Sequence, residues 1–305
     1  MLLRWCGTWV PAACRNPGRE VYAPAAAGGR AGTALLPCAP GNGPLAPRSV
    51  ECIAGSATRV PRTVPARNAI KGFDFPPGRI LAGKYEVVTK LGRGWEGEVY
   101  LIRELTTGIE RTAKFFFPHR NLRDRAALFH ARKLHKLRHC PIVIQYHTQE
   151  VVRFRDQDIT CLVSEFVEGE LLYKFLQRQR GGRLAPFPAL HLLHALAAGL
   201  ESIHGMHEYH GDLHTENIIV QRYGLGFELK FLDMFNWGQP TRENMRHDVV
   251  EAIRVFHEAL GGSQHYAKLP PEVKSICCGM KRSLILKKFR STGQLRHHLE
   301  TLEWH

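Results

Sequence analysis

The strongest constraint on the fold is one change in hydrophobic periodicity along the chain. Between Lys84 and about residue 165 the pattern predicts mainly strands, beginning with alternating apolar and polar residues at 85–91. After Gly169 the apolar residues recur mainly at helical spacing. Strands followed by helices predict an α+β chain with two lobes, an antiparallel-sheet N-lobe and a helical C-lobe. We place the N-lobe at about residues 82–168 and the C-lobe at about residues 169–305.

The pattern also predicts the individual elements of both lobes. In the N-lobe we expect one helix and five strands, at residues 121–138 and at 85–91, 98–103, 110–117, 142–152 and 159–165. Residues 105–108 (Leu-Thr-Thr-Gly) form a turn between the second and third strands. In the C-lobe we expect helices at 171–180, 187–207, 245–260 and 293–303, with short strands at 217–221 and 228–232.

Residues 1–70 differ from the rest of the chain. They contain nine of the 18 Pro, eight Arg, no Lys, and only two acidic residues, Glu20 and Glu51. No helical or strand period persists there, and such a segment buries too little apolar surface to offset its ordering entropy. We expect a disordered N-terminal tail before a folded domain at residues 71–305. An organelle-targeting segment and a translation start further along the chain are alternative interpretations.

The overall composition excludes several classes of protein. Apolar residues make up 44% and charged residues 23%, as in globular proteins. No stretch has the roughly 18 apolar residues of a membrane span, so we expect none. Eight Cys are too few for a disulfide scaffold and predict a reducing compartment, the cytoplasm; the organelle-targeting interpretation of the N-terminus is the alternative. We expect a monomer.

The net charge of +14 permits anionic partners such as nucleotides or phosphates without specifying one. The basic run at residues 281–288 is typical of a solvated surface, and no stacking-aromatic pattern indicates nucleic-acid binding. Six histidines lie between residues 191 and 214, but none has the spacing of metal ligands.

The first motif with chemical meaning is a glycine-rich segment. Gly92, Gly94 and Gly97 form G-x-G-x-x-G, with Val99 following in a predicted strand. Glycine lets backbone N–H groups approach phosphate oxygens without a Cβ in the way. A dinucleotide-binding loop would be followed by a helix, whereas here a strand follows, so the segment is the tip of a hairpin. A simple glycine-rich hairpin is the alternative.

Three further features of the sequence contain charged or amide side chains that could take part in a site. Lys114 ends the third predicted strand, where it is either solvated or placed to neutralise phosphates. Asp212 and Asn217 lie five residues apart in His-Gly-Asp-Leu-His-Thr-Glu-Asn, a spacing that suits a loop holding a carboxylate for a hydroxyl proton and an amide oxygen for a metal ion. Asp233 follows a hydrophobic strand, and a carboxylate there suits a hard cation, although each acid could also be a turn residue.

Together the four features, in this order and at these intervals, resemble the protein-kinase-like superfamily over roughly residues 82–262. The resemblance implies a two-lobed kinase fold with a trimmed helical C-lobe. It implies ATP and Mg²⁺ as cofactors and an unidentified hydroxyl acceptor, a protein or a small molecule, as the partner.

The resemblance also implies roles for individual residues. Gly92, Gly94, Gly97, Val99, Lys114, Glu165 and Val167 would bind ATP, the last two in the segment that contacts adenine, with Ser164 before it. Asp212 would be the catalytic aspartate, supported by Lys114 and Asn217. Asn217 and Asp233 would be the metal ligands, and Asp248 would brace the catalytic loop.

The chain departs from the family pattern at several positions. His130 stands where a helix glutamate would pair with Lys114; a neutral imidazole cannot replace a carboxylate, and Glu165 or Asp124 are the candidates to compensate. His214 replaces a lysine, and the loop His-Gly-Asp-Leu-His is similar to that of aminoglycoside phosphotransferases. Only 15 positions separate Asp233 from Asp248, so the activation segment is nearly missing.

Two smaller departures complete the comparison. Met234 and Phe235 replace Phe-Gly after the metal-binding aspartate, and the chain after Ala259 is short. We expect a Mg-ATP-dependent phosphotransferase, a Ser/Thr protein kinase. A small-molecule kinase of the aminoglycoside-phosphotransferase type and a pseudokinase that acts as a binding module are the alternatives.

Overall fold

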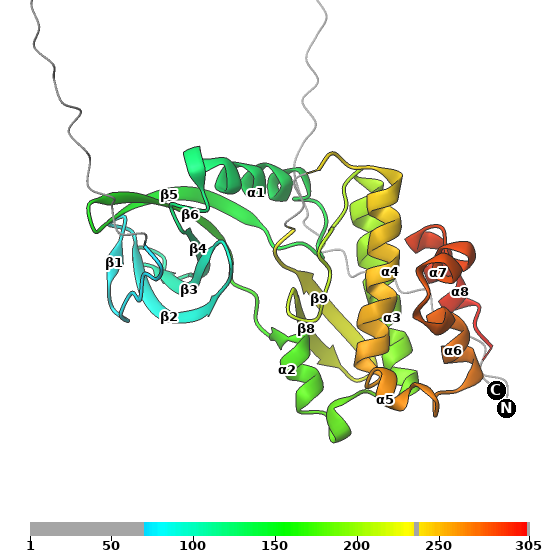
Figure 1. Ribbon diagram of the computed structural model, residues 1–305. Coiled ribbons are helices and arrows are strands. Elements are labelled where there is room, and N and C mark those ends of the chain that lie inside the picture. The colour runs from blue at the N-terminus through cyan, green and yellow to red at the C-terminus, as the bar shows by residue number, and fades with distance from the viewer. Residues whose placement is uncertain (1–69, 235–237, 304–305) are drawn as a thin grey trace, which may run out of the picture. The chain divides into compact units, whose positions relative to one another are not determined.

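The computed structural model describes residues 70–234 and 238–303 (Figure 1). Apart from Ile70, the predicted tail lies outside the described residues. Ile70 itself is buried in the hydrophobic core of the first sheet. The predicted boundary after residue 70 stays a prediction, but a shortened chain should keep this core residue and begin at or before residue 68, where the compact unit 68–305 starts.

Six antiparallel strands form the first sheet, in the spatial order β1-β2-β3-β4-β6-β5. Strands that are consecutive in sequence are joined by hairpins except β4 and β5, between which the chain forms a helix (Figure 1). The strands are β1 (Ile80–Leu81), β2 (Tyr85–Arg93), β3 (Gly97–Glu104), β4 (Glu110–Phe116), β5 (Tyr146–Phe154) and β6 (Gln157–Glu165).

Aromatic side chains fill the core of this sheet. Phe75 lies 5.0 Å from Phe115 between ring centroids, and Phe73 lies 5.9 Å from the same ring. The segment before β1 is held to the sheet because Phe73 N donates to Glu98 Oε2 and Phe75 N donates to the hydroxyl of Tyr100. This anchoring fixes β3, which begins at the glycine-rich hairpin.

The helix between β4 and β5 is shorter than predicted. A 3-10 turn (Leu122–Asp124) precedes α1 (Arg125–Lys136), because Arg123 and Asp124 adopt positive φ angles and cannot continue an α-helix. The helix contacts β5 and β6. Its buried residues are Ala126, Ala127, His130, Lys133 and Leu134. His130 therefore lies on the face of α1 that is turned towards the protein interior.

A second, three-stranded sheet belongs to the C-terminal part, in the order β7-β8-β9 (Glu170–Leu171, Ile218–Tyr223, Gly226–Phe231). Its β9 contacts α3, which packs against α4 and α8 (Figure 1). The helices are α2 (Leu172–Gln177), α3 (Pro186–Gly205), α4 (Arg242–Ala259), α5 (Ser263–Tyr266), α6 (Pro271–Cys277), α7 (Arg282–Lys288) and α8 (Thr292–Glu300). A core of leucine, isoleucine, valine and phenylalanine joins them.

The α+β arrangement is as predicted, and two details differ. The strand predicted at 142–152 was wrong at its start, because β5 begins only at Tyr146. The apolar residues before β5 pair with the end of β9 instead. Phe231 N donates to Ile142 O at 2.6 Å, and Val143 forms an isolated bridge with Phe231. The short elements β1, β7, α5, α6 and α7 were not predicted, since two to seven residues are too few to show a period.

Candidate functional site

The glycine-rich segment is the tight hairpin between β2 and β3. Gly94 N donates to Gly97 O at 2.9 Å, which leaves Trp95 and Glu96 at the tip. Gly97 faces the backbone of β4 so closely that a Cβ there would lie 1.9 Å from the carbonyl oxygen of Phe115. No atom lies within 4 Å of the corresponding positions at Gly92 and Gly94. Close packing therefore requires glycine at 97, whereas the structure leaves room for a side chain at 92 and 94.

Replacing Gly97 by Ala should destabilise the protein. The added methyl group cannot fit against β4 without a shift of backbone, which costs about 2 kcal/mol or more of unfolding free energy. Gly94→Ala is the matched control, because its Cβ would point into open space and should cost less than about 1 kcal/mol. Urea unfolding of both variants measures the difference, and equal losses would contradict the assigned packing.

Lys114 lies on β4 directly opposite Val99 of β3. Its Nζ donates to Asp233 Oδ1 at 2.7 Å and to Glu96 Oε2 at 2.9 Å. Burial alone would lower the pKa of Lys114, but the negative charges of Asp233 and Glu96 outweigh it and the pKa is raised. The side chain is therefore a fixed cation between two acidic groups, one from the hairpin and one from the end of β9.

The carboxylate beside Lys114 was not the one expected. Glu165 accepts hydrogen bonds from Gln145 N and Lys230, and Asp124 accepts one from Thr160, so neither candidate compensates for His130. The hairpin residue Glu96 does so instead. One signal in the sequence could have indicated Glu96, because it is an acidic residue at the tip of the glycine-rich hairpin.

Asp233 follows β9 with a φ angle of 41°, the left-handed region that few residues other than glycine adopt. Burial favours the neutral acid, but the charge and hydrogen bond of Lys114 outweigh it and lower the pKa of Asp233. Met234 is buried next to it. Phe235, the second residue that replaces Phe-Gly, lies outside the described residues.

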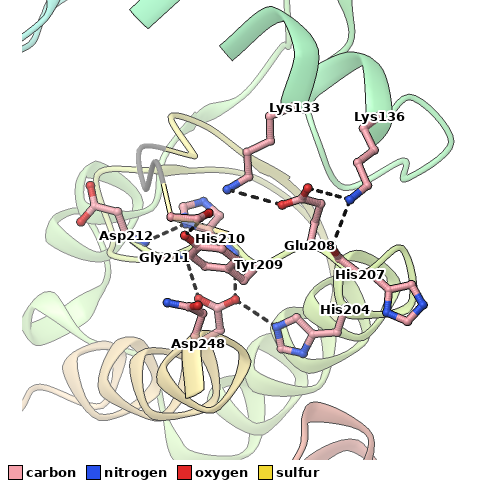
Figure 2. A network of polar contacts seen from close by, with 12 residues as sticks. Lys133, Lys136, His204, His207, Glu208, Tyr209, His210, Gly211, Asp212 and Asp248 are labelled. Carbon is pink, nitrogen blue, oxygen red and sulfur yellow. Dashed lines mark hydrogen bonds and ion pairs between the residues drawn. The ribbon is translucent and has the colours of Figure 1, made fainter. Parts of the chain in front are cut away.

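Asp248, a fully buried residue of α4, holds the loop that contains Asp212 (Figure 2). Its carboxylate accepts hydrogen bonds from His210 N and Gly211 N, both at 2.8 Å, and it lies 2.9 Å from His204 Nε2. Two consecutive backbone N–H groups on one carboxylate fix the chain direction just before Asp212. The bracing contact implied for Asp248 is thus present in the structure.

His210 fixes the same loop from its other side. Burial of the imidazole ring lowers the pKa of His210 to about 4, so the ring is neutral. Nε2 lies 3.0 Å from Leu232 O, which can only accept, so Nε2 carries the proton and Nδ1 accepts the N–H of Asp212. This ring links the loop directly to the residue before Asp233.

Asp212 and Asn217 lie together at the open side of this loop. Asn217 Nδ2 donates to Asp212 O at 2.9 Å and lies 3.3 Å from Asp212 Oδ2. Because the amide nitrogen makes these contacts, Oδ1 is the atom of Asn217 that can coordinate a cation. The side chain of Asp212 is half exposed and accessible to an acceptor molecule, with His214 Nε2 at 3.8 Å.

Helix α1 is tied to the residues that precede this loop (Figure 2). Lys136 Nζ donates to Glu208 Oε1 at 2.7 Å, and Lys133 Nζ lies 3.9 Å from Glu208 Oε2. Lys133 also lies 4.4 Å from the ring centroid of Tyr209, the residue before His210. These contacts connect α1 to the loop that contains Asp212 through two lysines that the sequence analysis did not single out.

The predicted adenine-contacting residues lie at and just after the end of β6. Ser164 is buried and pairs with Thr112 of β4. Glu165 is the last residue of β6, and its N–H donates to Gln145 O. Val167 follows in the connection to β7 and is partly buried. Their assignment as adenine contacts stays a prediction.

Along residues 70–234 and 238–303, no group of three or more His, Cys, Asp or Glu side chains is arranged to hold a metal ion. His204 contacts Asp248, and His194 Nε2 lies 3.1 Å from Glu300 Oε1. Within the same ranges, no helix combines the length and apolar character of a membrane span. Two of the six histidines between residues 191 and 214, His194 and His204, thus lie close to carboxylates.

Comparison with known proteins agrees with this geometry. The profile of the protein kinase domain matches residues 85–258, more than half of the chain. The serine/threonine-protein kinase pkn2 of Myxococcus xanthus is 35% identical over 164 residues, 52% of this chain and 18% of that protein. An Aurora kinase of Schizosaccharomyces pombe is 27% identical over 191 residues, 61% of this chain and 51% of that protein. The chain thus spans less than two thirds of the length of these relatives.

The fold is also found among solved structures. The kinase domain of PknI from Mycobacterium tuberculosis, solved as a mutant, superimposes with a TM-score of 0.52 at 16% sequence identity. The match covers 74% of this chain and 99% of the PknI domain. The predicted two-lobed kinase fold is therefore confirmed, and with the matching profile, the chain belongs to the protein kinase domain family.

Proposed function

We propose that this protein is an ATP-dependent serine/threonine protein kinase. The observation that carries the proposal is the meeting of Lys114 from β4 with Asp233 from the end of β9, beside a loop in which Asn217 contacts Asp212. Lys114 and Asp233 are 119 positions apart in sequence and come from different elements, whereas Asp212 and Asn217 lie five positions apart in one loop. The groups that meet here are one cation, two carboxylates and one amide. Such a set suits the binding of a nucleoside triphosphate and of a hydroxyl acceptor.

The proposed mechanism assigns one task to each group. The backbone of the hairpin at Gly92–Gly97 covers the phosphates, and Lys114 neutralises their charge. Asp212 accepts a hydrogen bond from the acceptor hydroxyl and orients its oxygen towards the γ-phosphorus. Catalysis is then positioning and electrostatic stabilisation, the main contributions in phosphoryl transfer.

The residues present also fit a divalent cation, for which we propose Mg²⁺. Asp233 offers a carboxylate and Asn217 an amide oxygen, and Mg²⁺ is commonly held by one or two such oxygens together with phosphate oxygens. When bound, the cation would neutralise charge that develops on the transferring phosphate. Asp233 is ionised for this task, because Lys114 lowers its pKa.

Replacing Asp233 by Ala should remove the dependence of ATP affinity on Mg²⁺. The variant loses the one carboxylate that we assign to the cation, and Asn217 alone offers a single neutral oxygen. Calorimetric titration with ATP, with and without Mg²⁺, measures this difference. Glu228→Ala on β9 is the control and should keep the wild-type dependence. An Asp233→Ala protein that still binds ATP only with Mg²⁺ would contradict the metal role.

The type of acceptor is tested by letting the full chain transfer label. The purified protein is incubated with γ-labelled ATP, Mg²⁺ and a cell extract, and labelled proteins are separated from labelled small molecules. We expect label in protein that is absent when Asp212→Asn protein is used. Asp212-dependent label in a small metabolite would instead identify a small-molecule kinase, the type that the His-Gly-Asp-Leu-His loop resembles. No Asp212-dependent label in either fraction would indicate a pseudokinase.

A further inference from the structure

Lys114 needs an acidic partner, and helix α1 does not supply one. His130 is one of the buried residues of α1 and is 5% exposed. Its Nε2 lies 2.9 Å from Glu96 Oε2. The same carboxylate oxygen lies 2.9 Å from Lys114 Nζ. Glu96 therefore bridges the helix and the lysine strand.

The backbone of the hairpin directs Glu96 inward. At the tip, Trp95 points outward and is 61% exposed, with the guanidinium of Arg120 3.9 Å from its ring centroid. Glu96, the next residue, is 4% exposed. Its carbonyl oxygen accepts the N–H of Phe117 at 2.8 Å, which ties the tip of the hairpin to the chain after β4.

The charges at Glu96 agree with this placement. Burial would favour its neutral form, but the hydrogen bond from His130 and the charge of Lys114 outweigh burial and lower the pKa of Glu96. The ionised carboxylate accepts the Nε2–H of His130, so a neutral imidazole suffices for this contact. A buried carboxylate is costly unless it is paired, and here Lys114 and His130 both contact Oε2 of Glu96.

We propose that Glu96 is the positioning residue that holds Lys114 in place for the phosphates, with His130 orienting Glu96. The inference rests on the proposed function, because it assigns Lys114 to nucleotide phosphates. It means that the acidic partner of the lysine comes from the loop that covers the phosphates. The lysine is then correctly placed only when the hairpin is closed.

Helix α1 has a different task under this proposal. Its contacts from Lys133 and Lys136 to Glu208 anchor it to the catalytic loop. His130 is thus presented from a helix fixed to the C-terminal part, and Glu96 comes from the hairpin between β2 and β3. Assembly of the phosphate site would accordingly follow the position of the hairpin and not a rotation of α1.

The test compares Glu96→Gln with the double variant Glu96→Gln/His130→Glu in the full chain. The first variant keeps the shape of Glu96 and removes its charge, and the second returns a carboxylate from the helix side. Glu110→Gln is the matched control, since Glu110 lies on the same strand as Lys114 but pairs with Arg103 at the surface. Melting temperatures establish that each variant is folded.

For Glu96→Gln we expect kcat/KM for ATP to fall about 30-fold, because the lysine loses one of its two acidic partners. Adding His130→Glu should restore kcat/KM to within about 3-fold of wild type, since the missing charge is returned to Lys114. Glu110→Gln should equal wild type. A Glu96→Gln protein with wild-type kcat/KM, or a folded double variant without recovery, would overturn the proposal.

Amide hydrogen exchange at residues 93–97 without nucleotide gives a second readout that does not depend on activity. Exchange should be at least about 5-fold faster in Glu96→Gln than in wild type, because the hairpin loses its tie to Lys114 and His130. Unchanged exchange would overturn the closure of the hairpin through Glu96. If the wild-type protein shows no Asp212-dependent transfer, the proposed function fails, and this readout still decides whether Glu96 holds the hairpin.

Discussion

Replacing Asp212 by Asn should lower kcat about 100-fold or more, as expected for the loss of the group that orients the acceptor hydroxyl. The amide keeps the size of the side chain and can still contact Asn217, so the loop should keep its shape. The affinity for ATP should change little, because Asp212 contacts neither Lys114 nor the glycine-rich hairpin. Steady-state kinetics and ATP titration measure both quantities.

The control for this variant is Glu216→Gln. Glu216 is an exposed acid of the same loop that lies one residue before Asn217. Its loss removes a similar charge from the neighbourhood without touching the contacts of Asp212, so kcat should stay near that of wild type. Equal effects of the two substitutions would mean that general electrostatics, not the position of Asp212, supports turnover.

Replacing Asp248 by Ala should lower the unfolding free energy by about 3–5 kcal/mol, since it removes a fully buried carboxylate and leaves its donors without a partner. The donors are the N–H groups of His210 and Gly211. His204 Nε2 also loses the atom it faces. Equilibrium urea unfolding with a common m-value measures the change.

The control on the same helix is Glu251→Ala. Glu251 forms ion pairs with Arg254 and His247 near the surface of α4, and such pairs contribute about 0–1 kcal/mol. A loss for Asp248→Ala that is no larger than the loss for Glu251→Ala would contradict its role as the brace of the catalytic loop. Because the brace acts just before Asp212, a folded Asp248→Ala protein should also have a lowered kcat.

Periodicity predicted the fold well because each lobe depends on elements long enough to show a pattern. The strands β2, β3, β4 and β6 have seven to nine residues, more than three strand periods, and the helices α3 and α4 have 20 and 18. The order of these elements fixes the architecture. The start of β5 was missed, since the apolar residues before Tyr146 pair with Phe231 of β9. Contacts between distant segments leave no local period in the sequence.

In the candidate site too, residues that belong to motifs could be predicted from the sequence, and a residue that acts through a distant contact could not. Lys114, Asp212, Asn217 and Asp233 stand in motifs whose order carries information, and the structure brings Lys114 to Asp233 and Asn217 to Asp212. The partner of Lys114 could not be predicted in the same way. Glu96 is 18 positions from Lys114 and 34 from His130, and only the turn of the hairpin directs it to both.

The most direct test of the central claim is the identity of the amino acid that receives phosphate. The full wild-type chain and the Asp212→Asn chain are incubated with γ-labelled ATP, Mg²⁺ and an extract, and the labelled proteins are hydrolysed to phosphoamino acids. The account predicts phosphoserine or phosphothreonine with wild type and a loss of about 100-fold or more with Asp212→Asn. Equal labelling by the two chains, or labelled protein without either phosphoamino acid, would contradict it.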